Sequence, residues 1–303
     1  MIHLLGFQTS QNKKLLACFL FLLIYCITLG GNLLLLTVAS FSKSLHSPMY
    51  FFLSHLSVAD VILINDILPF MLHTFLVEKA TMSLSGCITQ YFFFALSEAS
   101  ECLLLTAMCY DRYLAICQPL HYNVIMSLQC RWLMVTTCWL ISLSLGLIPT
   151  LTISTLYFCG PNIVDHFFCD LDPLLQLSCT DTTIVKLEVA LMSAMFVVVP
   201  FFVIIVSYVY IIVTIFKIPS VTGRKKAFST CSSHLTVVSI YYCTLVCVYL
   251  VPRRGQAWNL MKFLSLLYTV ITPTMNPIIY SLRNKDLKNV VEKIIKKFLN
   301  TYK

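Results

Sequence analysis

The chain has 303 residues, of which 58% are hydrophobic and only 11% are charged, and its formal net charge is +8. Soluble domains carry about 25% charged residues, so this chain has too few charges to cover a water-facing surface of its size. The composition excludes an ordinary soluble protein and indicates an integral membrane protein.

Seven apolar runs are each long enough to cross a bilayer, which takes about 20 helical residues. They lie at Leu15–Ala39, Met49–Val77, Tyr91–Cys109, Trp132–Leu156, Val189–Phe216, Ala227–Val251 and Phe263–Leu282. We predict an all-α membrane protein, a bundle of seven transmembrane helices forming one domain over residues 1–303. Residues 1–14 would precede the bundle, residues 15–282 would form it, and residues 283–303 would be a tail. No room is left for a soluble catalytic domain.

Two of these runs need comment. Lys13 and Lys14 precede the first run as they would in a signal peptide. That run has about 25 residues, whereas a cleaved apolar core has about 7–15, so we expect a retained helix. Glu98 and Glu101 interrupt the third run, which makes it the least regular span.

The distribution of basic residues predicts that the N-terminus lies outside the cell and the C-terminus inside, because Lys and Arg are in excess on the cytoplasmic side. In this orientation the inner side holds 14 basic residues and the outer side 7. The inner ones are Lys43, Arg112, Arg131, Lys217, Arg224, Lys225, Lys226 and the seven from Arg283 onward. The outer ones are Lys13, Lys14, Lys79, Lys186, Arg253, Arg254 and Lys262. Locally, Lys13 and Lys14 oppose this assignment, but the whole-chain tally outweighs them.

The basic tail also carries an apolar stripe at helical spacing, which predicts a short amphipathic helix on the membrane surface after the seventh span. The stripe consists of Val290, Val291, Ile294, Ile295 and Phe298. The same tail could contact an intracellular partner, and the two roles are compatible.

Four of the 14 cysteines fall on the proposed outer side, which is oxidising, so we expect disulfides there. They are Cys87, Cys159, Cys169 and Cys179, and they can pair in three ways. A bond from Cys87 to the long loop between the fourth and fifth spans would fix that loop over the mouth of the bundle. A metal pair of His166 and Cys169 would lack a third ligand, and we favour the disulfides.

Polar residues on four spans reach the same depth in the membrane. Asp60 and Glu101 each lie about 16 Å from the inner ends of their spans at 1.5 Å per residue. Asn32 and Asn276 lie about 10–12 Å from the inner ends of theirs by the same rise. Two carboxylates at one depth must share a proton or bind a cation such as sodium. The alternative is a neutral hydrogen-bonded pair that joins helices. In either case this layer is a candidate hinge.

Five motifs resemble one family. MCYDRYLAIC (Met108–Cys117) is similar to the MAYDRYVAIC signature of odorant receptors, a branch of the rhodopsin-like (class A) G-protein-coupled receptors. PMYFFL (Pro48–Leu53), LSVAD (Leu56–Asp60), KAFSTCSSHL (Lys226–Leu235) and PTMNPIIYSLRN (Pro273–Asn284) look like the family's other marks, in the same order. The KAFSTC form resembles the terrestrial-type class.

The resemblance implies roles for particular residues. Asp111 and Arg112 would form an inner lock, from which Arg112 is released on activation to receive the G protein's terminal helix. Tyr208 and Tyr280 would stabilise the open state. The full set of switch residues that the resemblance implies is Asp111, Arg112, Tyr113, Tyr208, Asn276, Pro277 and Tyr280. It also implies the disulfides Cys87–Cys169 and Cys159–Cys179, with Cys87–Cys179 as an open alternative.

The ligand site of such receptors lies in the outer half of the bundle, and it binds small volatile molecules. By this resemblance its wall consists of Phe94, Ala95, Glu98, Ala99, Met192, Ser193, Phe196, Tyr242, Leu245, Val246, Tyr249 and Thr269. Apolar and aromatic walls with a few polar groups suit a small organic ligand, although each aromatic residue could equally pack in the core or face lipid. Glu98 departs from the family pattern, which has a small or neutral residue there. It could anchor a basic odorant, or be a protonated carboxyl bonded within the bundle.

We therefore expect an odorant receptor that activates a stimulatory, olfactory-type G protein and raises cAMP. It would be a multi-pass plasma-membrane protein in the cilia of olfactory sensory neurons, with no nucleic-acid partner and no cofactor apart from the sodium ion considered above. The rival readings are a non-olfactory chemoreceptor of the same fold, a channel or transporter, and an intramembrane enzyme. A channel would need a polar stripe or repeats, and an enzyme would need a nucleophile with a matched base. Neither pattern is present in the sequence.

Overall fold

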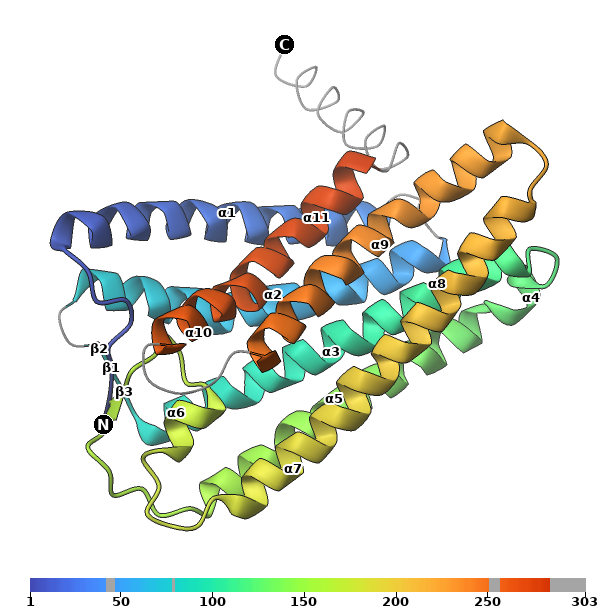
Figure 1. Ribbon diagram of the computed structural model, residues 1–303. Helices are drawn as coiled ribbons and strands as arrows, with labels where there is room; N and C mark the ends of the chain where they lie inside the picture. Colours follow the sequence, from blue (N-terminus) through green and yellow to red (C-terminus); the bar gives the residue numbers. More distant parts are fainter. Residues whose placement is uncertain (42–46, 78–79, 251–256, 284–303) are drawn as a thin grey trace.

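The computed structural model describes residues 1–41, 47–77, 80–250 and 257–283. For some of these helix residues, Val246 and Tyr249 among them, only the backbone is described. The predicted amphipathic helix of the tail lies outside the described residues. The described chain is a bundle of long helices that run side by side (Figure 1).

The predicted spans all correspond to helices. The first four are α1 (Gln11–Phe41), α2 (Pro48–Leu76), α3 (Leu84–Cys117) and α5 (Leu128–Ser154). The fifth is α7 (Thr183–Ser193), a π-helical turn η2 (Ala194–Val198) and α8 (Val199–Lys217). The sixth is α9 (Val221–Leu250), and the seventh is α10 (Ala257–Leu266), a second π-helical turn η3 (Leu267–Ile271) and α11 (Thr272–Arg283). Two short helices, α4 (Tyr122–Ile125) and α6 (Leu171–Leu175), lie in connecting segments.

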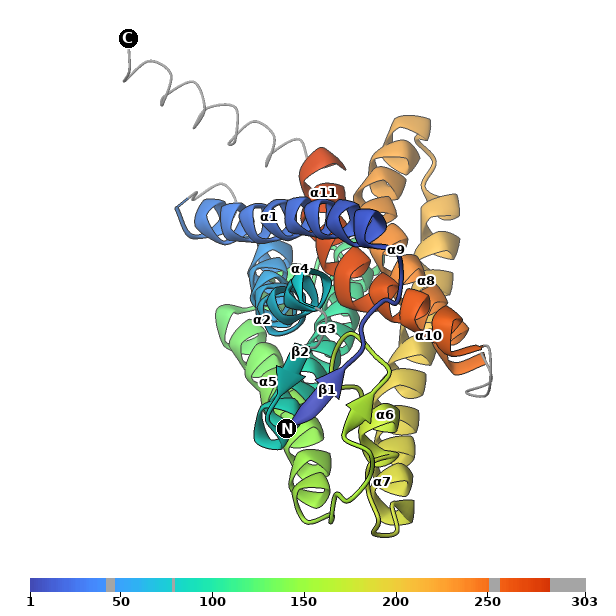
Figure 2. The same ribbon diagram turned by 90° about the vertical axis from the view of Figure 1, so that its left-hand side faces the viewer.

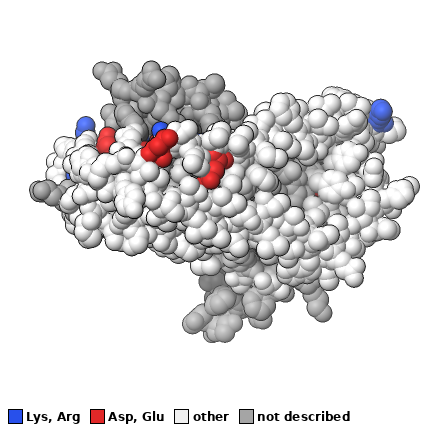
Figure 3. All heavy atoms as spheres, turned by 90° about the horizontal axis from the view of Figure 1, so that it is seen from below, with Lys and Arg blue, Asp and Glu red and all other residues white. Residues whose placement is uncertain are grey.

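Within the described residues, six helices are long and apolar enough to cross a membrane by themselves: α1, α2, α3, α5, the continuous fifth span and the stretch Leu260–Tyr280. The remaining long helix, α9, has 30 residues and packs against α3, α8 and α11 as the sixth member of the bundle. The face of the molecule in Figure 3 is almost entirely uncharged, as a surface in contact with hydrocarbon must be.

Helix α3 is longer than the predicted span Tyr91–Cys109 at both ends. Its first turn is stabilised by Ser83, whose hydroxyl accepts a hydrogen bond from the Gly86 N–H at 3.0 Å. This N-cap satisfies a backbone donor that the helix cannot satisfy itself. At the other end Asp111 and Arg112 are buried in the bundle, so the helix continues beyond its apolar run. Counting apolar residues therefore underestimates a span whose ends carry paired polar groups.

A small three-stranded sheet closes one end of the bundle, which we call the disulfide end because both disulfides lie there. Its strands are β1 (Ile2–Leu4), β2 (Ala80–Met82) and β3 (Ile163–Val164), in the order β2–β1–β3. β1 is antiparallel to β2, with Ile2 opposite Met82, and parallel to β3. Figure 2 looks at the molecule from this end. The prediction of purely helical structure lacked this sheet.

Residues after β1 are held by side chains from two other segments, α10 and the long loop before α6. The buried ammonium of Lys262 donates to the Gly6 carbonyl at 3.0 Å and to Asp165 Oδ1 at 2.5 Å. The ring of Phe7 lies 5.5 Å from that of Phe167 and 5.7 Å from that of Phe263, measured between centroids. The N-terminal segment is therefore packed into the disulfide end as an ordered part of it.

Gly6 makes this arrangement testable, because its φ is +58° and a Cβ there would lie 2.7 Å from Thr74 Oγ1. We expect Gly6→Ala to destabilise the attached N-terminus by about 1–2 kcal/mol or more, since side chains disfavour this conformation. Hydrogen exchange at residues 2–6 should then accelerate. Gly30→Ala is the control, because a Cβ there meets nothing within 4 Å. Unchanged exchange in Gly6→Ala would show that the segment is not held in this way.

Candidate functional site

Two disulfides organise the disulfide end. Cys87 at the start of α3 is bonded to Cys169, with 5.3 Å between the Cα atoms, and Cys159 is bonded to Cys179, with 5.9 Å. Both separations lie in the usual range for disulfides. These are the pairs that the family resemblance implied, and the alternative Cys87–Cys179 is not formed.

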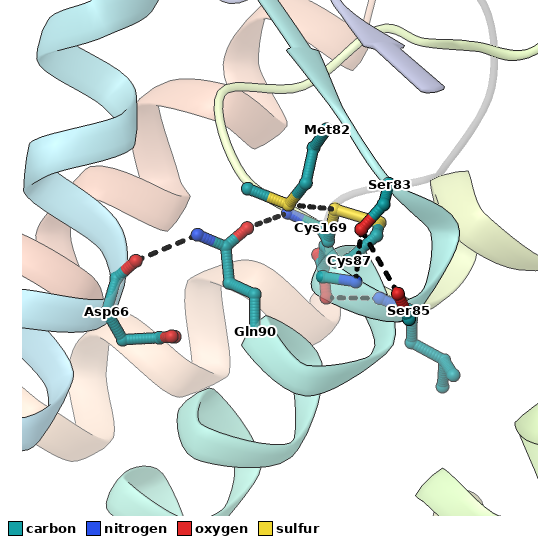
Figure 4. The surroundings of a disulfide bond; sticks show 10 residues. Asp66, Met82, Ser83, Ser85, Cys87, Gln90 and Cys169 are labelled. Carbon is teal, nitrogen blue, oxygen red and sulfur yellow. Dashed lines mark hydrogen bonds between the residues drawn. A yellow bond between two sulfur atoms is a disulfide. The ribbon is translucent and has the colours of Figure 1, made fainter. Parts of the chain in front are cut away.

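A glutamine reinforces the first disulfide (Figure 4). The Gln90 side chain accepts the Cys169 N–H at 2.9 Å and donates to the Asp66 carbonyl at 2.8 Å. It thereby links α3, α2 and the long loop. The bond and the amide together hold Phe167 and Phe168, which lie just before Cys169 in the loop, in the core.

His166 packs against aromatic side chains at the disulfide end and is not positioned as a metal ligand. Its ring lies 4.6 Å from that of Phe167 and 4.7 Å from that of Phe168. Burial, followed by the charge of the neighbouring Lys262, lowers its pKa from an ordinary 6.5 to about 3. In the described part of the chain, no three His, Cys, Asp or Glu side chains are grouped as a metal site.

The polar layer proposed from the sequence is assembled in the core. Nδ2 of Asn276 lies 3.0 Å from each oxygen of the Asp60 carboxyl. Asn32 donates to the carbonyls of Thr28, at 3.1 Å, and of Pro273, at 3.3 Å. Asn32 and Glu101 also lie within reach of the Asp60 carboxyl.

This layer has more acceptors than donors. Both carboxyl oxygens of Glu101 and the amide oxygens of Asn32 and Asn276 are buried without a hydrogen-bond partner among the described residues. Unpartnered buried acceptors are costly, and two facing carboxyls repel when both are charged. The arrangement thus suits either a proton shared between the carboxyls or a bound cation.

The Asp111–Arg112 pair, for which the family resemblance implied an inner lock, lies at the other end of α3, which we call the Arg112 end. The Arg112 guanidinium donates through Nε to Asp111 Oδ2 at 2.9 Å, and a second contact joins Nη2 to the same oxygen. The Tyr122 hydroxyl of α4 donates to Asp111 Oδ1 at 2.8 Å. Burial, followed by the Asp111 charge, raises the pKa of Tyr122. Sequence reasoning missed Tyr122, because no pattern in the chain marks it as the partner of Asp111.

A histidine joins three helices next to the lock. The buried His234 of α9 bonds through Nδ1 to the Tyr208 hydroxyl of α8 at 2.7 Å and through Nε2 to the Leu105 carbonyl of α3 at 3.1 Å. Tyr208 was among the switch residues that the resemblance implied, but His234 was not predicted as its partner. A clue was available, because His234 belongs to the KAFSTCSSHL motif.

The other predicted switch residues are distributed along the bundle. Tyr280 of α11 is buried, and its hydroxyl has no partner among the described residues. Tyr113 is half-buried and packs edge-on against Tyr210, with 6.3 Å between centroids. Pro277 lies inside α11 and leaves little room beside Gly31, whose Cβ would approach the proline ring to 3.1 Å. Pro277 therefore lies at a close approach of α11 to α1.

The predicted ligand-site residues fall into three groups. Glu98, Phe196 and Tyr242 lie around Cys102, whose thiol contacts the Phe196 carbonyl at 3.1 Å and the Tyr242 hydroxyl at 3.2 Å. Phe94 packs on Phe168, with 5.1 Å between centroids. Ala95, Ala99, Met192, Ser193 and Leu245 are half-buried, Thr269 is buried on η3, and the side chains of Val246 and Tyr249 lie outside the described residues.

The Glu98 side chain is half-buried, and one of its carboxyl oxygens has no hydrogen-bond donor beside it. Oε1 is buried without a hydrogen-bond partner in the described chain. The hydroxyl of the fully buried Tyr241 donates to the backbone carbonyl of Glu98 at 3.2 Å. Sequence reasoning missed Tyr241 and Cys102 because each resembles an ordinary apolar core residue of its helix.

The fold is similar to that of squid rhodopsin, with a TM-score of 0.75 over 97% of this chain and 88% of that chain, at 15% sequence identity. That likeness defines the class of fold: a bundle of membrane helices arranged as in rhodopsin. The sequence profile described as "Olfactory receptor" matches residues 21–298.

Two relatives match along almost their whole length. Olfactory receptor 11L1 of Homo sapiens is 44% identical over 97% of this chain and 92% of its own, and Olfactory receptor 1M1 of Mus musculus is 45% identical over 98% and 95%. The chain belongs to the olfactory receptor family. Its members are receptors and not enzymes, and coupling to a G protein is expected of this fold.

Proposed function

We propose that a small volatile odorant binds beside Glu98 in the half of the bundle nearer the disulfide end, and that binding alters the Arg112 end. The observation that carries this proposal is one face of α3. Glu98, Cys102 and Leu105, at successive turns, contact Tyr241, Tyr242 and His234 of α9. Arg112 lies on the same face, close to Cys231 of α9. A ligand that shifts α9 against α3 would disturb this row down to the lock.

We propose that the disulfide end is extracellular and the Arg112 end cytoplasmic. Disulfides persist in oxidising compartments, and the basic residues favour this orientation by two to one. In this arrangement residues 1–14 are extracellular, residues 15–282 form the bundle and residues 283–303 are the cytoplasmic tail of a single receptor domain. Release of Arg112 from Asp111 would open a site for the G protein, with Tyr208, Asn276, Pro277 and Tyr280 on the neighbouring helices and Tyr113 next to Arg112.

The partner we propose is a stimulatory, olfactory-type G protein that raises cAMP, in the cilia of olfactory sensory neurons. A chemoreceptor of the same fold in another tissue would use the same residues, and only its place of expression would differ. The wall of the odorant site consists of the residues assigned above, with Val246 and Tyr249 included on the basis of the sequence.

Glu98 defines the preferred ligand class within this proposal. A buried carboxyl oxygen without a donor, such as Oε1 of Glu98, is stabilised by a ligand that supplies a positive charge or an N–H group. We propose that Glu98 anchors basic odorants, and that the surrounding Phe94, Phe196 and Tyr242 accommodate their apolar parts.

One reporter experiment tests both the switch and the anchor. Cells with the olfactory-type G protein would be screened for cAMP responses to amines, acids, alcohols and ketones. We expect Arg112→Ala to abolish every response. We expect Glu98→Gln to weaken the potency of amines at least about 30-fold, the cost of removing one partner of a buried charge pair, while neutral odorants keep theirs.

Asp181→Asn is the control for Glu98→Gln, because this carboxylate is exposed at the disulfide end and accepts from the Thr183 N–H at 2.9 Å and hydroxyl at 2.6 Å. Surface expression of each variant would be measured with an antibody. Equal effects of Glu98→Gln on amines and neutral odorants would reject the anchor. Full responses in Arg112→Ala would reject the switch.

We also propose that a sodium ion occupies the polar layer between Asp60 and Glu101, because the layer has unpartnered oxygens and excess acceptors. An ion that binds only the folded receptor raises its stability. Sodium chloride should therefore raise the unfolding temperature of the purified protein relative to choline chloride, and Glu101→Gln should remove the difference while Glu188→Gln keeps it. Identical unfolding in the two salts would favour the shared proton instead.

A further inference from the structure

A hollow of about 720 Å³ lies between α8 and α9 at the Arg112 end. The two helices are joined there by only three residues, 218–220, and they run side by side from that turn (Figure 1). The hollow is lined by Ile212, Ile215, Phe216, Val221, Arg224, Lys225, Phe228, Ser229 and Ser232. We call it the α8–α9 groove.

The α8–α9 groove lies on the outward-facing surface of these two helices, away from the core of the bundle. Of its rings, Phe216 is 73% exposed and Phe228 is 60% exposed. The face of α9 that points into the bundle is different, since it carries the buried Cys231, His234 and Val238. The groove is therefore reached from the surrounding lipid rather than from the space beside Arg112.

The groove is amphipathic. Phe216, Phe228 and Ile212 provide an apolar wall, whereas Arg224 and Lys225 provide two positive charges near the turn. A long apolar surface with a basic group at one end matches a molecule that has hydrocarbon and an anionic head.

Arg224 and Lys225 have no acidic partner on α9 or on the neighbouring α8. No Asp or Glu occurs in the sequence between Glu188 and Asp286. In the part of the chain that the structure describes, neither Arg224 nor Lys225 forms an ion pair, and Nε of Arg224 is buried without a hydrogen-bond partner. A buried donor of this kind is costly unless a ligand satisfies it.

We propose that the α8–α9 groove binds an anionic phospholipid, whose phosphate contacts Arg224 and Lys225 and whose acyl chain lies along Phe216 and Phe228. The proposal relies on the orientation proposed above only in one respect, that anionic lipids are concentrated in the cytoplasmic leaflet. The bound lipid would contact α8 and α9 together, and so would favour the arrangement of these helices that holds the groove at its present width.

Native mass spectrometry of the purified receptor tests this proposal. The receptor would be titrated with phosphatidylserine and, separately, with phosphatidylcholine. We expect phosphatidylserine to bind more tightly, and we expect the double variant R224Q/K225Q to lose about 30-fold in affinity for it, the combined contribution of two basic residues near an anionic headgroup. Phe228→Ala should weaken the binding of both lipids, because the acyl chains of both would contact the apolar wall.

The matched control is the double variant K13Q/K14Q, which removes the same charge from the start of α1 at the other end of the bundle. It should bind phosphatidylserine like the wild type. Equal binding of the two lipids by the wild type, unchanged binding in R224Q/K225Q, or an equal loss in K13Q/K14Q would each overturn the proposal. A wild-type receptor that shows this lipid selectivity but gives no odorant response in reporter cells would instead count against the proposed function alone.

Discussion

Inside a bilayer, the polar groups of α3 and α9 can bond only within the protein, because bulk water is absent from the hydrocarbon core. Glu98, Cys102 and Leu105 meet their α9 partners under this constraint. Each hydrogen bond contributes on the order of 1 kcal/mol. The row is therefore strong enough to define one packing and weak enough for a ligand to favour another.

The same constraint applies to two other polar sites on α3. Near its middle, Glu101 has buried oxygens without donors, and at the Arg112 end both oxygens of Asp111 are occupied, one by Arg112 and one by Tyr122. A ligand shifts the equilibrium between two packings of α9 on α3 only by the difference between its binding free energies for the two packings. The odorant site that we propose beside Glu98, which adjoins α9 through Tyr241, is well placed to have such a difference.

The spans and the polar layer were predictable from the sequence, since long apolar runs and the rare polar groups within them are clear signals in a membrane. The contact between Asp111 and Arg112 was implied by the family resemblance. The sheet at the disulfide end was not, because strands of two or three residues carry no periodicity and their pairing depends on distant segments. Lys262 shows the same limit: in the sequence it is one outer charge, whereas in the fold it joins Gly6 and Asp165. The partners Tyr122 and His234 likewise emerge only when helices are packed.

The most direct test of this account is the distance between α4 and α9 at the Arg112 end, with and without an activating odorant. Spin labels on encoded non-natural amino acids at Val124 and Thr222, both exposed, would avoid the ten free cysteines. The account predicts that saturating odorant creates a second, longer population in double electron–electron resonance. A distance distribution that stays the same while the odorant is bound and active would contradict it.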